Sequence, residues 1–212
     1  MTYKDRRSAG RELAGELEKY QEEDVIVLGL PRGGVEVAYE VAEALNAPLD
    51  VIVTRKLGAP SNPEYGFGAI GPGGVRVLDD RAVQMLGLDE DQIDRIADRE
   101  QGEMERRLQR YRGDRPMPEL EKRTVIVVDD GVATGGTARA AIRALHELGA
   151  GTLVLAVPVA PPDTADELEE MVDDFVCLQT PTAFMAVGQW YRDFSQTTDG
   201  EVEKLLEKAQ SN

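Results

Sequence analysis

Four short, mostly apolar runs constrain the fold of this chain more than any other feature of its sequence. They span residues 25–30, 49–54, 124–128 and 153–159. A strand that is apolar at consecutive positions is typically buried on both faces, as in a parallel sheet. Segments with the apolar spacing of helices lie between the runs, and this alternation predicts a doubly wound, mostly parallel α/β fold. We expect its topological switch point between the strands that end at Leu30 and Val128.

The remaining segments complete this pattern. Apolar spacing predicts helices over residues 8–22, 37–45, 89–111, 138–148 and 163–172 and from about residue 199, and a short last strand over residues 175–178. Residues 57–67, with two prolines, two glycines, Ser and Asn, are predicted to form a loop long enough to serve as a lid. Residues 68–78 are predicted to form a hairpin that turns at Gly71-Pro-Gly-Gly.

The most informative motif is VIVVDDGVATGGT, residues 125–137. A buried strand would deliver Asp129 and Asp130 to the carboxyl edge of the sheet, where such folds bind ligands. The Gly- and Thr-rich turn that follows opens a helix, whose backbone N–H groups and positive end favour an anion. Because two carboxylates would repel a bare polyphosphate, we interpret them as acceptors for sugar hydroxyls. The motif therefore indicates a phosphate beside a diol, as in ribose 5-phosphate.

This motif resembles the phosphoribosyl pyrophosphate motif of the type I phosphoribosyltransferases, with four aliphatic residues, Asp-Asp and Thr-Gly-Gly-Thr in succession. The resemblance extends over residues 25–159. It implies that Asp129 and Asp130 hold the ribose hydroxyls. It also implies that the 5-phosphate binds to Ala133, Thr134, Gly135, Gly136 and Thr137.

Two further segments resemble parts of the same family. The turn after the first strand resembles its pyrophosphate-binding loop, which implies that the substrate is also bound by Pro31, Arg32, Gly33 and Gly34. Arg55 and Lys56 stand directly before the loop predicted over residues 57–67. In the family a basic pair opens a flexible loop that closes over the active site, so the resemblance implies a lid here and a catalytic role for Arg55 and Lys56.

Aromatic residues gather near the C-terminus, in TPTAFMAVGQWYRDF. They include Phe184, Trp190 and Tyr191, whose rings are suited to stack on a planar base. The family covers its base with a variable hood. We therefore expect one domain, residues 1–212, with a small hood that comes partly from residues 180–195. Packing in the core or in a dimer interface explains the same aromatics equally well, and this alternative stays open.

Other motifs are weaker or absent. Residues 66–71 fit the dinucleotide fingerprint G-x-G-x-x-G, but they lead into Gly-Pro-Gly-Gly and not into a helix. Residues 131–137 lack the Gly-Lys-Ser/Thr ending of a P-loop. A receiver-like phosphorylation site also ends a strand in paired acids, but it does not need a Gly-Thr turn. Cys177 lies in an apolar run and is predicted to be a buried structural thiol. With the single His146 it forms no zinc set, so we predict no dedicated metal site.

Charge restricts the partners. The chain has 40 acidic and 24 basic residues and a formal net charge of −16, which disfavours nucleic acid as a partner. This excess, with scarce lysine, favours adaptation to high salt over an ordinary acidic protein. The polar N-terminus indicates no signal peptide, and no apolar run has transmembrane length. We expect a cytoplasmic homodimer that does not contact membranes.

The resemblance implies a glycosyltransferase that moves ribose 5-phosphate from phosphoribosyl pyrophosphate to a nitrogenous base and releases pyrophosphate. Mg²⁺ would arrive bound to the substrate. A non-catalytic regulator that binds phosphoribosyl pyrophosphate is the main alternative, and the basic pair with its lid favours catalysis over it. A sugar-phosphate hydrolase is a weaker alternative, because the sequence supplies no obvious nucleophile for one.

Overall fold

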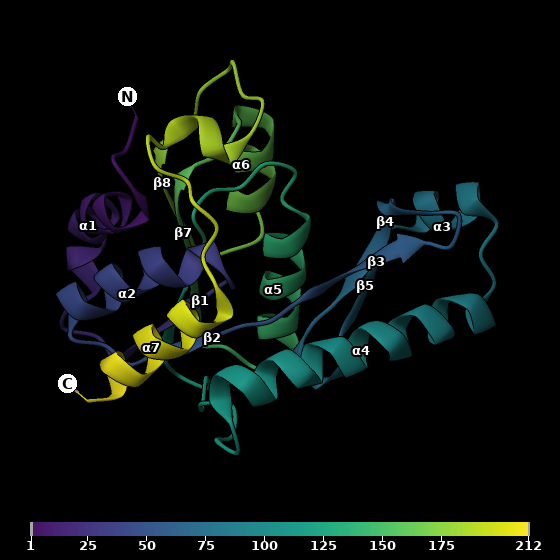
Figure 1. Cartoon of the computed structure of the whole chain (residues 1–212), viewed down its shortest axis with the longest axis horizontal. Coiled ribbons are helices and arrows are strands. Elements are labelled where there is room, and N and C mark those ends of the chain that lie inside the picture. The colour runs from purple at the N-terminus through teal and green to yellow at the C-terminus, as the bar shows by residue number, and fades with distance from the viewer. Residues whose placement is uncertain (1, 212) are drawn as a thin grey trace.

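A five-stranded parallel sheet forms the centre of the molecule (Figure 1). The structure is a computed structural model that describes residues 2–211. In spatial order the strands are β2 (Leu49–Val51), β1 (Val25–Gly29), β6 (Thr124–Val128), β7 (Thr152–Val159) and β8 (Asp174–Gln179). Because β1 pairs in parallel with both β2 and β6, the chain adds strands first on one side of β1 and then on the other. The predicted doubly wound fold is confirmed, with its switch point between β1 and β6.

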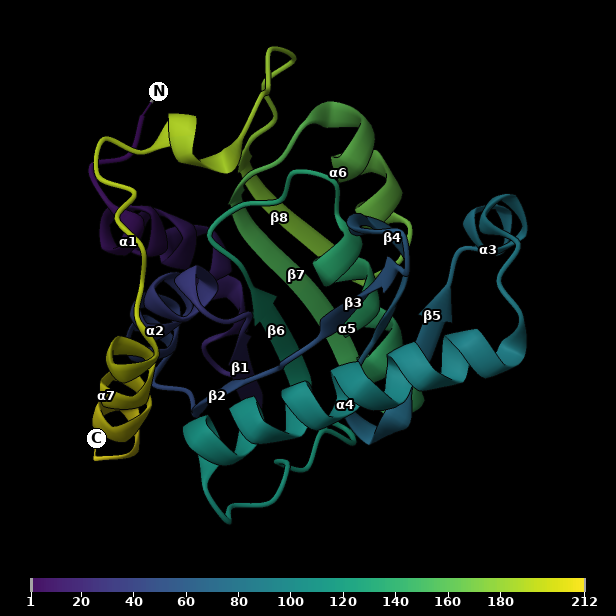
Figure 2. The ribbon, with the colours of Figure 1, turned by 45° about the vertical axis from the view of Figure 1, so that its right-hand side comes forward.

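Helices cover both faces of this sheet (Figure 2). One face packs against α1 (Arg6–Leu17), α2 (Gly33–Leu45) and α7 (Asp199–Gln210), and the other against α5 (Gly136–Glu147) and α6 (Pro162–Glu169). Alternate residues of one strand serve the two faces. Ile126 and Val128 pack on the side of α2, whereas Val125 and Val127 pack on the side of α5. This two-sided burial explains why β6 is apolar along its whole length.

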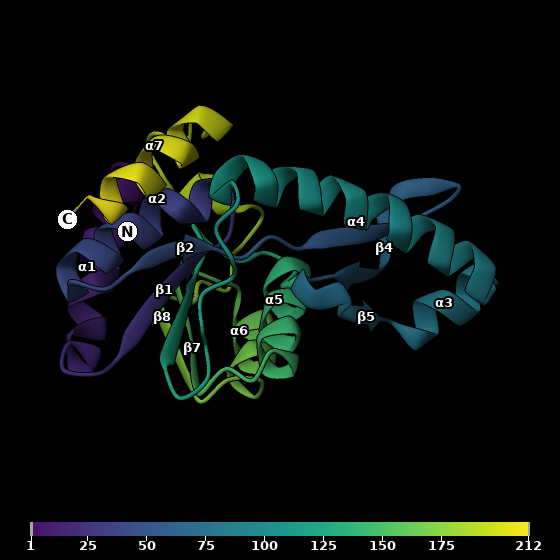
Figure 3. The same cartoon turned by 90° about the horizontal axis from the view of Figure 1, so that it is seen from below.

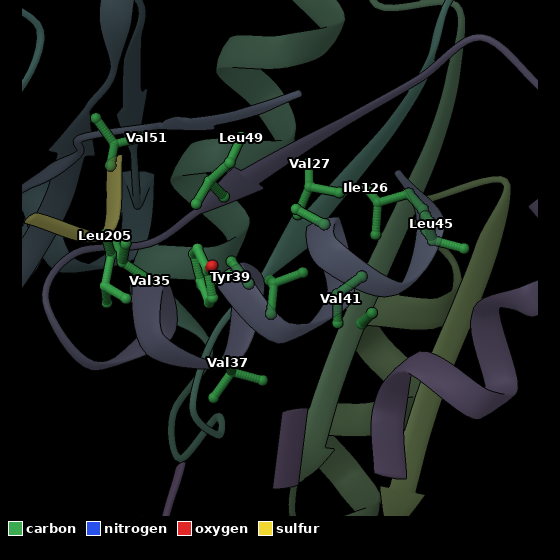
Figure 4. Packing of buried hydrophobic residues seen from close by; sticks show 14 of the residues in the cluster. Val27, Val35, Val37, Tyr39, Val41, Leu45, Leu49, Val51, Ile126 and Leu205 are labelled. Carbon is green, nitrogen blue, oxygen red and sulfur yellow. The ribbon is translucent and has the colours of Figure 1, made fainter. Parts of the chain in front are cut away.

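The packing of α2 positions the carboxyl edge of the sheet. Figure 4 shows Tyr39 and Val41 of α2 in one cluster with Val27, Leu49 and Ile126 of three neighbouring strands. All five side chains are buried. The start of α2, and the turn that leads into it, are therefore held close to the ends of β1 and β6.

A second, antiparallel sheet extends to one side of the first (Figures 1 and 3). It consists of β3 (Arg55–Ala59), β4 (Asn62–Ile70) and β5 (Arg76–Leu78), with the 3₁₀ turn η2 (Pro72–Gly74) between β4 and β5. Together with α3 (Asp80–Leu86) and α4 (Glu90–Arg112) this sheet forms the arm of the molecule, which encloses a small core of its own. The hairpin predicted over residues 68–78 is confirmed by the pairing of Gly68 with Leu78 and of Ile70 with Arg76.

The prediction of a loop over residues 57–67 is wrong, because this segment lies in the β3–β4 hairpin. Leu57 and Phe67 are fully buried in the core of the arm, and this burial overrides the local turn preference of the prolines and glycines. Gly58 serves the pairing itself, since an added Cβ there would lie 2.4 Å from the carbonyl oxygen of Pro63. Arg55 and Lys56 are therefore residues of a strand and do not precede a loop.

The other predicted elements are present, with shifts at their ends. The first helix continues into the 3₁₀ turn η1 (Glu18–Tyr20), and the strand predicted over residues 49–54 ends at Val51. Helix α3 was not predicted, although Asp79 caps its start and Gly87 ends it in the left-handed conformation. Within residues 2–211, none of the helices combines the length and apolar character needed to cross a bilayer.

Candidate functional site

Asp129 and Asp130, the acidic pair, follow β6 directly at the carboxyl edge of the sheet. The side chain of Asp130 is only 14% exposed, and Asp129 Oδ1 accepts a 2.8 Å hydrogen bond from the backbone N–H of Asp130. Burial and the neighbouring carboxylate raise the pKa of Asp129 well above its ordinary value. Burial also raises the pKa of Asp130, although Arg6 opposes this rise. Two carboxylates held where their charge is costly are typical of a binding site.

The Gly-Thr turn, residues 133–137, follows the acidic pair and leads into α5. Ala133, Thr134, Gly136 and Thr137 are exposed, and Gly135 caps the helix with a φ of 74°. The turn is held through its carbonyl groups, because Thr164 Oγ1 donates to Ala133 O at 3.0 Å and Arg139 donates to Thr134 O. The first N–H groups of a helix have no partner within the helix, so this exposed end can receive an anion.

The Pro-Gly turn, residues 31–34, connects β1 to α2 and packs on the acidic pair. An added Cβ at Gly33 would lie 2.0 Å from Asp130 Oδ2, and one at Gly34 would lie 2.8 Å from Asp129 Cα. Such close approach requires glycine at both positions. The peptide bond between Pro31 and Arg32 is cis, and Arg32 is the residue before α2. The structure thus brings together two motifs that lie nearly a hundred residues apart in the sequence.

Arg6 is a residue of this site that the sequence reasoning missed. Its Nε donates to Asp130 Oδ2 at 2.7 Å, and its Nη1 donates to the carbonyl oxygen of Ser195 at 2.7 Å. The local sequence shows only an arginine in the first turn of an N-terminal helix. Nothing in that pattern indicates a partner 124 residues away, so no sequence signal could have found it.

Arg55 and Lys56 are directed elsewhere. The Nε and Nη2 atoms of Arg55 donate to Glu100 Oε2 on α4 at 3.0 and 2.7 Å. The stem of Lys56 crosses Gly66 of the same hairpin, where an added Cβ would lie 3.0 Å from Lys56 Cδ. In this structure Arg55 therefore pairs with α4, and the stem of Lys56 lies on the β3–β4 hairpin.

The tail segment, residues 180–198, passes over the carboxyl edge of the sheet and includes the 3₁₀ turn η3 (Val187–Trp190). Val187 covers Gly131, because an added Cβ at Gly131 would lie 2.6 Å from Val187 Cγ1. The rings of Phe184 and Trp190 stack with centroids 6.4 Å apart. Tyr191 is buried and donates to the carbonyl oxygen of Asp130.

The ring of Tyr191 is already packed between two others. Its centroid lies 5.5 Å from that of Tyr3 and 5.1 Å from that of Phe194. Of the three aromatic residues predicted for a hood, the structure therefore pairs Phe184 with Trp190 and places Tyr191 deeper, against the backbone of the acidic pair.

The single cysteine and the single histidine each contact a backbone carbonyl oxygen. Cys177 was predicted to be buried and is half-buried. Loss of hydration raises the pKa of its thiol to about 11, and the thiol contacts Gln179 O at 3.3 Å. His146 is exposed on α5 with Nε2 2.9 Å from Met171 O. Across the described part of the chain, residues 2–211, no three His, Cys, Asp or Glu side chains are grouped to hold a metal ion.

Two hollows lie away from the acidic pair. One, of about 300 Å³, is at the amino ends of β1 and β6, where Asp24 and Arg123 line it. The other, of about 450 Å³, lies between the N-terminal helical segment and β8, and Glu16 and Lys19 line it on the helical side. Ligands of doubly wound sheets bind at the carboxyl edge, and the motifs converge there, so we assign no substrate to either hollow.

Comparison with known proteins points to one family. The model of the phosphoribosyl transferase domain matches residues 3–194. A Mycobacterium tuberculosis protein, provisionally named a phosphoribosyl transferase, is 49% identical over 207 residues, which cover 98% of this chain and 47% of that protein. The chain thus spans about half the length of the curated relatives it matches.

Two other similarities are informative. The crystal structure of TT1426 from Thermus thermophilus has a TM-score of 0.86 and 43% identity, and the match covers 98% of this chain and 99% of that one. A uracil phosphoribosyltransferase of Lactobacillus gasseri is 44% identical over 57 residues, which are 27% of each protein. The first similarity extends over the whole architecture, whereas the second is local.

Proposed function

The chain belongs to the phosphoribosyl transferase domain family, and from this membership we propose that it transfers ribose 5-phosphate from phosphoribosyl pyrophosphate to a nitrogenous base. One observation carries the proposal: the Pro-Gly turn packs on the acidic pair, and the acidic pair is followed in the chain by the exposed Gly-Thr turn. A sugar with a phosphate at each end needs these three parts side by side. The reaction forms a bond from ribose C1 to nitrogen, and the C1–oxygen bond breaks as pyrophosphate leaves with the electron pair. The proton of the attacking N–H group passes to water.

Each part of the substrate has a proposed partner. The Gly-Thr turn and the N-terminus of α5 bind the 5-phosphate through backbone N–H groups and the hydroxyls of Thr134 and Thr137. Asp129 and Asp130 accept hydrogen bonds from the ribose hydroxyls. The Pro-Gly turn, with the charge of Arg32, receives the pyrophosphate. The transition state resembles an oxocarbenium ion, so positioning and charge stabilisation supply most of the rate.

Mg²⁺ enters this scheme as part of the substrate. Oxygens of the substrate and water would hold the ion, as suits a cation that keeps several waters. The acidic pair consists of two neighbouring carboxylates and not of a closed set of ligands, which fits a metal that is brought by the substrate.

The β3–β4 hairpin is the proposed cover of the site, with Arg55 and Lys56 on its first strand. Their positive charge is suited to the departing pyrophosphate, and closure would exclude water. A contact of the Arg55 guanidinium with the substrate would replace its bonds to Glu100. Phe184 and Trp190 of the tail segment are the proposed platform for the base, with Tyr191 supporting them from below.

We further propose that residues 1–212 act as a single domain and that two copies form a homodimer.

A pyrophosphate-release assay tests the proposal. The protein is incubated at high KCl with phosphoribosyl pyrophosphate, Mg²⁺ and each of uracil, orotate, adenine, guanine, hypoxanthine, xanthine and simple amines. We expect release with at least one acceptor and none with Asp130→Asn. Tight binding without release across the panel would favour the regulator, and absence of binding would contradict the proposal altogether.

A further inference from the structure

Arg6 joins two parts of the chain that the proposed function leaves separate, the acidic pair and the tail segment. Its side chain is only 8% exposed. Nε contacts Asp130 after β6, Nη1 donates to Ser195 O in the tail segment, and the guanidinium lies 3.9 Å from the ring centroid of Phe194. A planar guanidinium serves two acceptors in a fixed geometry while its face lies on an aromatic ring, an arrangement that the compact ammonium of lysine does not reproduce.

The seat of Arg6 is formed by the surrounding backbone. Asp5 caps α1 in a reciprocal pair of hydrogen bonds with Ser8, which fixes the first helical turn where Arg6 stands. An added Cβ at Gly33 would lie 2.6 Å from Arg6 Nε and 2.0 Å from Asp130 Oδ2. The Pro-Gly turn therefore encloses the ion pair, and the absence of a side chain at residue 33 leaves the space that the pair occupies.

The charges around Asp130 explain what the arginine does there. Asp129 adjoins Asp130 on the same edge, the phenol of Tyr191 donates to the Asp130 backbone, and Asp193 lies within electrostatic range of Arg6. From α2, Glu36 Oε1 lies 3.9 Å from Arg6 Nη1. Among these neighbours Arg6 alone carries positive charge, and it opposes the rise that burial causes in the pKa of Asp130. Without Arg6, the neighbouring carboxyl groups of Asp129 and Asp130 would lie together in a poorly hydrated site.

We propose that Arg6 is a positioning residue that keeps Asp130 an oriented carboxylate for the ribose hydroxyls and links it to the tail segment at Phe194 and Ser195. This role rests on the proposed function, because it assigns the hydroxyls to Asp130. The four contacts and the near-complete burial of Arg6 show a built-in support, not a side chain that the substrate displaces.

The test begins without substrate. Carboxyl ¹³C NMR follows the Asp130 signal through a pH titration, and the signal is assigned by its loss in Asp130→Asn. The titration compares wild type with Arg6→Gln and Arg6→Lys. Arg7→Gln, on the exposed side of α1, is the control. We expect Arg6→Gln to raise the titration midpoint and Arg6→Lys and Arg7→Gln to leave it near that of wild type. An unchanged midpoint in Arg6→Gln would overturn the proposal.

Calorimetric titration with phosphoribosyl pyrophosphate and Mg²⁺ forms the second arm. If binding needs the carboxylate, each unit of rise in the pKa of Asp130 lowers affinity about tenfold at pH values below that pKa. The acid limb of affinity should therefore move to higher pH in Arg6→Gln, and stay in place in Arg6→Lys despite weaker binding. An equal loss at every pH would indicate a merely structural role. A wild-type protein that binds no phosphoribosyl pyrophosphate would contradict the proposed function, while the NMR titration still decides whether Arg6 controls Asp130.

Discussion

At the carboxyl edge of the sheet, single residues that are suited to bind a ligand reduce the stability of the fold. Asp129 is half-buried beside a second carboxylate, and the loss of hydration and this neighbour raise its pKa in the folded protein. A group with a raised folded pKa binds more protons when folded than when unfolded, so its contribution to stability falls as pH rises from the unfolded value through the folded one. At neutral pH, above the ordinary pKa of an aspartate, Asp129 therefore costs stability, and this cost is explained if its side chain is kept for a ligand.

We predict that Asp129→Asn raises Tm at neutral pH and weakens binding of phosphoribosyl pyrophosphate. The amide removes the buried charge, and the lost charged acceptor should cost about 1.5–3 kcal/mol of binding. Each kcal/mol of stability gained corresponds to roughly 2–4 °C of Tm in a protein of this size. Thermal melting and calorimetric titration of the same variant measure both effects. A variant that melts lower and binds as well as wild type would contradict both assignments.

At Gly33 the packing leaves no room for a side chain. We predict that Gly33→Ala costs about 1–3 kcal/mol of stability, as overpacking does, and also weakens binding, because the methyl group separates Arg6 from Asp130. Gly15 of α1 is the matched control, since an added Cβ there meets nothing within 4 Å. Gly15→Ala should stabilise the exposed helix by about 0.5–1 kcal/mol. Denaturant unfolding of the two variants decides the point, and equal effects would show that the space at residue 33 is not restricted.

At the scale of elements, the β3–β4 hairpin depends on burial along one face. Leu57 and Phe67 anchor it to α3 and α4, so the part free to move with a ligand is the tip around Pro60 and Ser61. The contact of Arg55 with the buried Glu100 ties the start of the hairpin to α4. Any closure over the site must therefore involve the arm as a unit or the exchange of that ion pair.

We predict that Lys56→Ala lowers the turnover number more than it weakens ground-state binding, because the charge that develops on departing pyrophosphate exists only in the transition state. Lys204→Ala on the exposed side of α7 is the control. Steady-state kinetics of pyrophosphate release and calorimetric Kd values separate the two effects. Turnover that is unchanged in Lys56→Ala would remove the lysine, and with it the covering role of the hairpin, from the mechanism.

At the scale of the whole molecule, the net charge of −16 is the dominant property. Many arginines already pair with acids, among them Arg11 with Glu40, Arg139 with Glu167 and Arg110 with Asp199. The remaining excess of carboxylates repels across the surface, and salt screens this repulsion between charges farther apart than the Debye length, which falls from about 10 Å at 0.1 M to about 3 Å at 1 M. We predict that Tm rises between low and molar KCl. Melting curves in a KCl series test this, and a falling Tm would reject salt adaptation.

The order of strands and helices was largely determined by the sequence itself. A parallel strand buried on both faces must be apolar throughout, and this pattern identified β1, β6 and β7 before any contact was known. Asp-Asp and Thr-Gly-Gly-Thr at the end of such a strand predicted the sugar and phosphate parts of the candidate site, because the chemistry lies within one short segment.

Tertiary structure alone decided what depends on residues far apart in the chain. The turn-forming residues 57–67 became a hairpin because Leu57 and Phe67 found a core in α3 and α4, a contact that local preference does not contain. Tyr191 entered the packing below the acidic pair, and Arg6 reached Asp130 across 124 positions. Local pattern reports what a segment prefers in isolation, whereas the free energy of burying an ion pair or an aromatic ring depends on partners that only folding brings together.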